Sequence, residues 1–308
     1  MERDPNVFCI GEDIGVYGGA FKVSERLAQK FGEAGVIDAP ISEIAMVGAA
    51  AGAAHMGLRP VLEMHFIDFI ANAYDMLTNY VATARYRAFL PCPMVVRGPS
   101  GGYVRGGPFH SQNPEAAFVH APGLKVVCPA TAEDAKGLIK AAIRDDDCVL
   151  FFEHKYLYRR IKAGMPNGGH VVPIGKARPP GKGRTSRSSR TRRRFGKRWR
   201  PPSSSNARMA SPWRSSTFAR WRRWTTPRST RRVEKTNCVL IVHEDTRTGG
   251  LAGEITARLN ERCFSWLDAP VMRITAHDVA LPYAPSLEDL VLPQTSDIVR
   301  GARWVLNY

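Results

Sequence analysis

The feature that most constrains this sequence is a stretch of 56 residues, 177–232, that contains no leucine, isoleucine or valine. Average amino-acid usage would place roughly a dozen of these residues in a stretch of that length. Without them the chain cannot bury enough apolar surface to offset the entropy lost on ordering. We therefore predict that this stretch, here called the aliphatic-free segment, builds no hydrophobic core and is irregular.

Positive charge is concentrated in the same place. The whole chain has a formal net charge of +16, from 44 Lys and Arg against 28 Asp and Glu. Residues 176–235 hold 17 Arg and 4 Lys but one acid, Glu234, so the rest of the chain has 23 basic and 27 acidic residues. Such an excess is typical of nucleic-acid-binding proteins, but it belongs to one segment and not to the whole chain.

Two interpretations of the aliphatic-free segment are open. One is a disordered nucleic-acid-binding region, in which Trp199, Trp213, Trp221 and Trp224 stack on bases. The other is a translational frameshift in a GC-rich gene, which yields Arg, Pro, Ser, Ala and Trp without aliphatic residues. The frameshift is favoured, because both edges are abrupt and a well-formed pattern resumes at once. A nucleic-acid partner is therefore not expected.

On both sides of this segment, short apolar runs alternate with helical stretches, which predicts an α/β fold. On the N-terminal side, strands are expected at residues 7–10, 94–96, 125–128 and 149–152, and helical spacing occurs at 44–55, 66–89 and 132–143. On the C-terminal side, strands are expected at 238–242 and 270–275, and helices at 252–263 and 297–306.

This pattern predicts two open, mostly parallel α/β domains. The first spans residues 1–165 and the second, as far as its sequence is present, 233–308. Residues 166–176 form the expected linker. The six cysteines form no C-x-x-C pair, no run of about 18 apolar residues occurs, and the first residues do not look like a signal peptide. A soluble, cytoplasmic protein is expected.

Three stretches carry side chains suited to chemistry. Glu43 enters a helix of small residues, where its carboxylate either stabilises the helix dipole or is buried and shares a proton with a heterocyclic nitrogen. Phe69 belongs to a set of aromatic residues at helical spacing, which form a core or contact a cofactor. A glycine-rich loop carries His110, a candidate general acid or base.

The sequence resembles one family at five motifs: residues 11–15 (GEDIG), 40–43 (PISE), 109–112 (FHSQ), 122–127 (PGLKVV) and 242–244 (VHE). All five are similar to beta subunits of the thiamine-diphosphate-dependent decarboxylating component of 2-oxo acid dehydrogenases. The similarity covers residues 1–176 and 233–308. Residues 110–116 and 151–159 look most like the branched-chain enzyme, with the pyruvate and acetoin enzymes as alternatives. The resemblance implies two domains of transketolase type, the first of which binds the pyrimidine of the cofactor.

Specific roles follow from this resemblance. Glu43 would hydrogen-bond N1′ of the aminopyrimidine and so promote removal of the proton at C2 of the thiazolium ring. Ile41 and Phe69 would line the same pocket. His110 would steer proton transfer as the acyl group passes to a lipoyl group. The expected catalytic residues are thus Glu43 and His110, and the expected cofactor contacts are Ile41, Glu43 and Phe69.

The resemblance also implies a metal site and partners. Relatives bind a structural potassium ion through oxygens at positions that match Met94, Ala142, Ile143, Asp145 and Asp147, the last replacing a more usual Asn. The chain lacks the Gly-Asp-Gly motif that holds Mg²⁺ and the diphosphate in thiamine enzymes. We therefore expect an alpha subunit to hold both, in an alpha2beta2 heterotetramer. A lipoyl-bearing acyltransferase would accept the acyl group from the 2-oxo acid substrate.

The chain departs from the family most clearly in the aliphatic-free segment. It stands where the family has a strand, a helix and a strand, and it has nearly their combined length, which favours a compensated frameshift over an insertion. Core strands of the second domain would then be missing. We expect the chain as written to be poorly stable.

Overall fold

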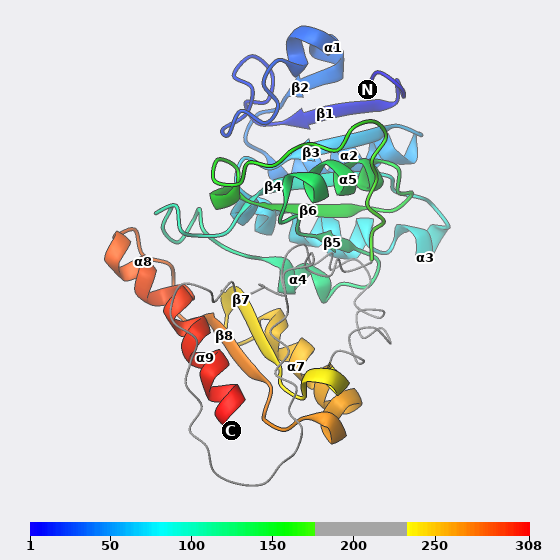
Figure 1. The fold of residues 1–308 in the computed structure, drawn as a ribbon. Helices are drawn as coiled ribbons and strands as arrows, with labels where there is room; N and C mark the ends of the chain where they lie inside the picture. The colour runs from blue at the N-terminus through cyan, green and yellow to red at the C-terminus, as the bar shows by residue number, and fades with distance from the viewer. Residues whose placement is uncertain (176–232) are drawn as a thin grey trace.

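The structure, a computed structural model, describes residues 1–175 and 233–308. The first range contains a sheet of order β2-β1-β3-β4-β6-β5 in which all pairs are parallel (Figure 1). The α/β prediction is therefore confirmed. Expectations about the aliphatic-free segment lie outside the described residues. The six strands are β1 (Val7–Gly11), β2 (Val36–Asp38), β3 (Arg59–Glu63), β4 (Val95–Ser100), β5 (Lys125–Val127) and β6 (Val149–His154).

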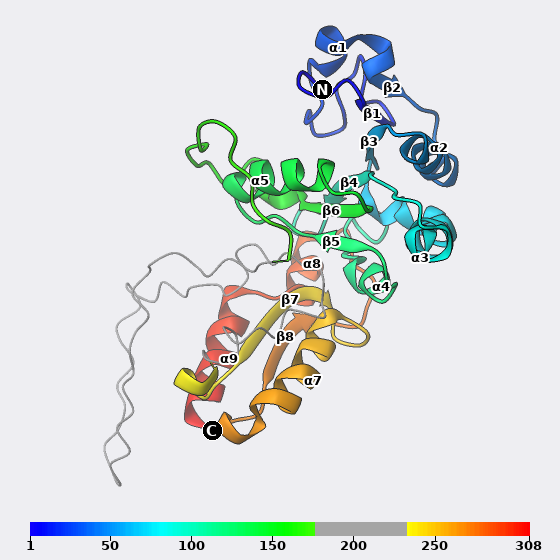
Figure 2. The ribbon, with the colours of Figure 1, turned by 90° about the vertical axis from the view of Figure 1, so that its right-hand side faces the viewer.

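Both faces of this sheet are covered. Neighbouring residues of a strand point to opposite faces, so Leu150 packs with α2 (Glu43–His55), whereas Val149 packs with α5 (Ala132–Ile143). Figure 2 shows α2 and α5 on opposite sides of the sheet. Burial on both faces explains why a strand such as β6 begins in the sequence as a continuous apolar run and not as an alternating one.

Residues 66–89 are helical as expected, but they form three short helices of different types. This stretch is divided into a 3₁₀ helix (Ile67–Ala73), a π-helix (Met76–Val81) and α3 (Ala84–Ala88). Ile67 and Ile70 are both fully buried, and their spacing of three suits the three residues per turn of a 3₁₀ helix. The first range also contains α1 (Leu27–Gly35) and α4 (Glu115–Val119).

The second range forms a smaller α/β unit. Its two described strands are parallel, and α7 and α9 lie on opposite sides of them (Figures 1 and 2). Helix α7 packs into the same hydrophobic cluster as α2, so the two ranges share a core. No helix in the described ranges is long and apolar enough to span a membrane. The elements are β7 (Leu240–Thr246), α7 (Leu251–Cys263), β8 (Met272–Ala276), α8 (Pro285–Val291) and α9 (Thr295–Asn307).

Candidate active site at the carboxyl ends of the strands

The sequence-predicted residues lie at one edge of the six-stranded sheet. Carboxyl ends of parallel strands meet there, and open α/β sheets bind ligands at that edge. Glu12 follows β1, the segment that carries Phe69 follows β3, the loop that carries His110 follows β4, and Lys155 follows β6. Residues from distant parts of the chain are thus delivered to one side of the molecule.

Glu43 is buried beside a second carboxylate. It is 8% exposed, and its Oε2 accepts a hydrogen bond of 3.2 Å from Asn72 Nδ2. Burial, and then the negative charge of Glu43, raise the pKa of the Glu12 carboxyl group. Glu12 Oε1 is buried and has no hydrogen-bond partner among the described residues.

Both interpretations of Glu43 remain predictions, and the arrangement bears on each of them. Its place in the first turn of α2 fits a role in stabilising the helix dipole. That role alone does not require Glu43 to be buried beside Glu12. Burial next to another carboxylate is unfavourable for a charged group. The raised pKa of Glu12 means that a proton or a proton-bearing group is favoured there, so these residues fit a ligand with a basic ring nitrogen such as an aminopyrimidine.

His110 is held between aromatic rings. Its imidazole packs edge-on against Phe66 and Phe69, with ring centroids 4.4 and 5.7 Å away. The structure therefore brings together two of the predicted site residues, His110 and Phe69. Ile41 is 84% exposed, so its expected place in a cofactor pocket stays a prediction.

Glu244, on β7, ties the His110 loop to the second range. Its Oε1 accepts hydrogen bonds from Gly102 N and Asn113 Nδ2, on either side of His110, and its Oε2 contacts His154 Nε2. Burial raises the pKa of Glu244, but His154 and these donors outweigh it, and the net pKa is lowered. The sequence shows the VHE motif but does not predict that Glu244 holds the His110 loop, because this contact depends on the tertiary fold.

A buried ion-pair network holds the strand ends beneath the site. Arg97 on β4 pairs with Glu63 on β3 and with Glu153 on β6, and its Nη2 donates to Tyr158 Oη at 3.0 Å. Its side chain is 7% exposed. Because the network joins three adjacent strands where the functional loops begin, it fixes their relative positions.

A cavity of about 1280 Å³ opens between the His110 loop and the second range. Phe109 and Gln112 line it from the loop, and Thr246 and Asp278 line it from the other side. In this loop, His110 packs against aromatic rings, whereas Phe109 and Gln112 line an open cavity.

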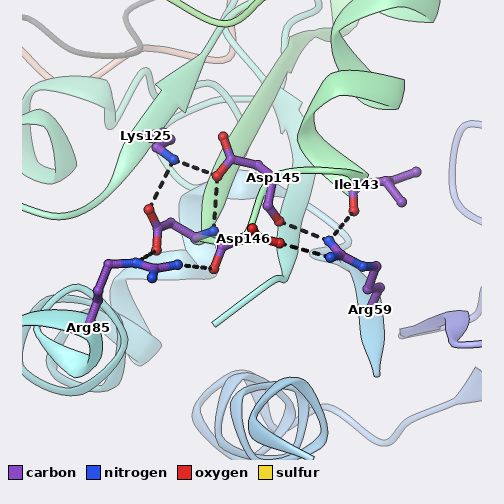
Figure 3. A network of polar contacts seen from close by, with 7 residues as sticks. Arg59, Arg85, Lys125, Ile143, Asp145 and Asp146 are labelled. Atoms are coloured by element: carbon purple, nitrogen blue, oxygen red, sulfur yellow. Dashed lines mark hydrogen bonds and ion pairs between the residues drawn. The ribbon is translucent and has the colours of Figure 1, made fainter. Parts of the chain in front are cut away.

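Figure 3 shows Ile143 and Asp145, two residues of the expected potassium site, in a network of polar contacts in which their oxygens have other partners. Lys125 Nζ lies 2.5 Å from Asp145 Oδ1 and 3.2 Å from Asp147 Oδ2. Arg59 donates to the main-chain oxygens of Ile143 and Asp145. Further contacts are Arg85 to Asp147, Asp147 N to Asp145 Oδ1, Asp145 N to Ala142 O, and Val149 N to Met94 O.

These contacts do not fit a potassium ion. Lys125 and Arg85 pair with the carboxylates that would ligate it, and Arg59 donates hydrogen bonds to the carbonyl oxygens, so a further positive charge would be placed beside Lys125. The potassium site stays a prediction that this geometry does not favour.

Comparisons with known proteins define the class of this fold and site. A family model described as "Transketolase, pyrimidine binding domain" matches residues 1–161, and one described as "Transketolase, C-terminal domain" matches residues 222–298. The second match begins inside the aliphatic-free segment. A solved structure, "Split gene transketolase, inactive beta4 tetramer", superposes with a TM-score of 0.61 at 15% identity, covering 99% of this chain and 93% of that one. The fold is thus of transketolase type.

Sequence relatives narrow the class to one family. The chain is 42% identical to "2-oxoisovalerate dehydrogenase subunit beta" of Bacillus subtilis (strain 168), over 100% of this chain and 95% of that protein. It is 38% identical to "Pyruvate dehydrogenase E1 component subunit beta-2, mitochondrial" of Oryza sativa subsp. japonica, over 98% of this chain and 82% of the relative. The chain belongs to the family of beta subunits of thiamine-diphosphate-dependent 2-oxo acid dehydrogenases, which are oxidoreductase components.

Proposed function

We propose that this chain is the beta subunit of a dehydrogenase that decarboxylates branched-chain 2-oxo acids, with pyruvate as the alternative substrate. The greater identity to the 2-oxoisovalerate enzyme supports the branched-chain substrate. The observation that carries the proposal is the buried pair Glu43 and Glu12 at the carboxyl edge of the sheet. It offers proton sharing where the pyrimidine end of the cofactor is expected.

Each site residue has a proposed task. When bound, thiamine diphosphate supplies the electron sink for decarboxylation. Glu43 holds N1′ of the aminopyrimidine by sharing a proton, Phe69 packs against the ring, and Ile41 borders the same pocket. His110 moves a proton while the acyl group passes to a lipoyl group.

We propose that three further components complete the reaction. An alpha subunit holds Mg²⁺ and the diphosphate, in an alpha2beta2 heterotetramer. A lipoyl-bearing acyltransferase accepts the acyl group. The domain limits, 1–165 and 233–308 with a linker at 166–176, and a cytoplasmic location are part of the same proposal.

The test is reconstitution. The purified chain is assayed with branched-chain 2-oxo acids and pyruvate, alone and together with its alpha subunit, thiamine diphosphate and Mg²⁺. We expect no decarboxylation by the chain alone and turnover with the complete set. Thiamine-dependent turnover by the isolated chain would contradict the proposed division of the cofactor between two subunits.

The aliphatic-free segment has its own test. We propose that it records a compensated frameshift, so the gene read in a shifted frame across this segment encodes aliphatic strands. A shifted frame without them, together with RNA binding that is lost when the segment is deleted, would support the nucleic-acid-binding interpretation.

A further inference from the structure

A buried pair of opposite charges lies next to the His110 loop. Asp68 is 6% exposed and Lys155 is 4% exposed. Neither Lys155 Nζ nor Asp68 Oδ2 has a hydrogen-bond partner in the described part of the chain. The two groups nevertheless act on each other electrostatically, because each shifts the pKa of the other toward the charged form.

Asp68 is connected to His110 in two ways. Its Oδ1 accepts a 2.8 Å hydrogen bond from Gln112 N, two residues after His110. It also lies between Phe66 and Phe69 in sequence, whose rings both contact the imidazole. One short segment therefore contacts His110 through two rings and holds its loop through a carboxylate.

Lys155 reaches the same place from the end of β6. Its Nζ lies 5.9 Å from the centroid of the Phe66 ring, at the outer limit of a cation–π contact. Burial lowers the pKa of Lys155 to about 8. The negative charges of Asp68, and then of Glu244 and Glu288, raise this pKa and so limit the shift. Burial raises the pKa of Asp68. The hydrogen bond from Gln112 N and then the positive charge of Lys155 lower it, but they do not cancel the effect of burial.

Stability alone gives no reason to keep this pair. Replacing a buried ion pair with apolar residues of similar volume is often neutral or stabilising. A pair without a direct hydrogen bond gains even less from its mutual attraction. Its contact with the His110 loop supplies a reason, because the Asp68 carboxylate accepts the Gln112 N–H and the positive charge of Lys155 favours the ionised form of that carboxylate.

We propose that Asp68 is a positioning residue for His110 and that Lys155 is its buried counter-charge. The proposal rests on the proposed function, since it concerns the step assigned to His110. It predicts that loss of the Asp68 acceptor releases the loop and lets the imidazole move away from the two phenylalanine rings. A displacement of about 1 Å at a reacting group can cost about 100-fold in rate.

The test compares four forms of the full chain assembled with its alpha subunit, each checked for heterotetramer formation. Asp68→Ala removes the acceptor, Asp68→Asn keeps an oxygen for Gln112 N, and Asp68→Asn with Lys155→Met also removes the unpaired ammonium. Asp268→Ala, at an exposed position after α7, is the matched control.

Two rates and one spectrum are measured. The first rate is deuterium exchange at C2 of the bound cofactor, which reports on Glu43, and the second is acyl transfer to a lipoyl acceptor, which reports on His110. The spectrum is the NMR signal of the isotope-labelled His110 ring. For Asp68→Ala we expect unchanged exchange, acyl transfer lowered about 10-fold to 100-fold, and a shifted or broadened His110 signal. The Asn–Met double variant should recover most of the transfer rate and the His110 signal.

Two results would overturn the inference. One is an Asp68→Ala form with the wild-type transfer rate and His110 signal, and the other is an equal loss of exchange and transfer. A wild-type assembly without any decarboxylation would contradict the proposed function instead, and the His110 signal would then still decide whether Asp68 positions the loop.

Discussion

Residues 1–175 and residues 233–308 bury their sheets to very different degrees. In the first range, the sheet has six strands, its strands β3, β4 and β6 are mostly buried, and Leu150 is 0% exposed. In the second, the described sheet has two strands, and four of the five residues of β8 are only half-buried. The first range therefore has a core of its own on the α5 face of its sheet, whereas the core on the α2 face is shared with α7 of the second range.

The two ranges also contribute differently to the candidate active site. The first range supplies Glu43, Phe69 and His110, together with the Arg97 network beneath them. The second contributes Glu244, which holds both sides of the His110 loop. Within the described residues, chemistry is thus concentrated in the well-packed range, and the other range fixes the loop.

The largest expected effect on stability tests the buried network of the first range. Arg97→Met leaves Glu63 and Glu153 buried without their counter-charge, and removing one partner of a buried ion pair typically destabilises a protein by about 3–5 kcal/mol. Urea unfolding followed by circular dichroism measures the loss. Arg300→Met is the control from the second range, because Arg300 pairs with Asp297 but is 77% exposed, and a change within about 0.5 kcal/mol is expected. Equal losses of unfolding free energy in both variants would contradict the proposed difference between the two ranges.

A matched pair of core truncations sharpens the comparison. Leu150→Ala, in the fully buried strand β6, should lower the free energy of unfolding by about 2–5 kcal/mol. Ile274→Ala, in the half-buried strand β8, should lower it by roughly 1 kcal/mol, since less apolar surface returns to water. Both are measured by urea unfolding. A larger loss for Ile274→Ala would show that the second range is the better packed one.

A smaller effect is expected at the acidic turn after α5. Lys125→Met leaves Asp145 and Asp147 without the ammonium between them, and a loss of about 1–3 kcal/mol is expected for this partly buried group. If Lys125 occupies the place of a cation, KCl should restore more of the melting temperature in the variant than in the wild type, relative to NaCl. A wild-type chain stabilised specifically by K⁺ would instead support the potassium site.

Much of the fold could be predicted from the sequence, but not all of it. The sequence predicts β1, β4, β5 and β6 from their apolar runs, and burial on both faces explains these runs best in β4 and β6. Strand β3 was missed, because Pro60 and the charged residues Arg59 and Glu63 interrupt the pattern in five residues. The sequence predicts one helical stretch where the structure has 3₁₀ and π segments, since i, i+3 and i, i+4 spacings are both typical of a helix.

The site was partly predictable for a similar reason. Glu43 and His110 lie within contiguous motifs, so a single stretch of sequence reveals each of them. Asp68 and Lys155 lie far apart in sequence and only the tertiary fold brings them together. Glu244 stood in a motif, but its contacts with Gly102 and Asn113 come from the packing of the two ranges.

The most direct test of the account is C2 deuterium exchange of the cofactor in Glu43→Gln, in a form of the chain with the family sequence restored across the aliphatic-free segment and assembled with its alpha subunit. Glutamine keeps the size and polarity of the side chain but cannot share the proton, so exchange should fall by about 10²–10⁴-fold, equivalent to roughly 3–5 kcal/mol of barrier, while circular dichroism stays unchanged. His110→Ala should exchange normally and fail in acyl transfer. Wild-type exchange in Glu43→Gln would contradict the account and leave Glu43 as a residue that stabilises the N-terminus of α2.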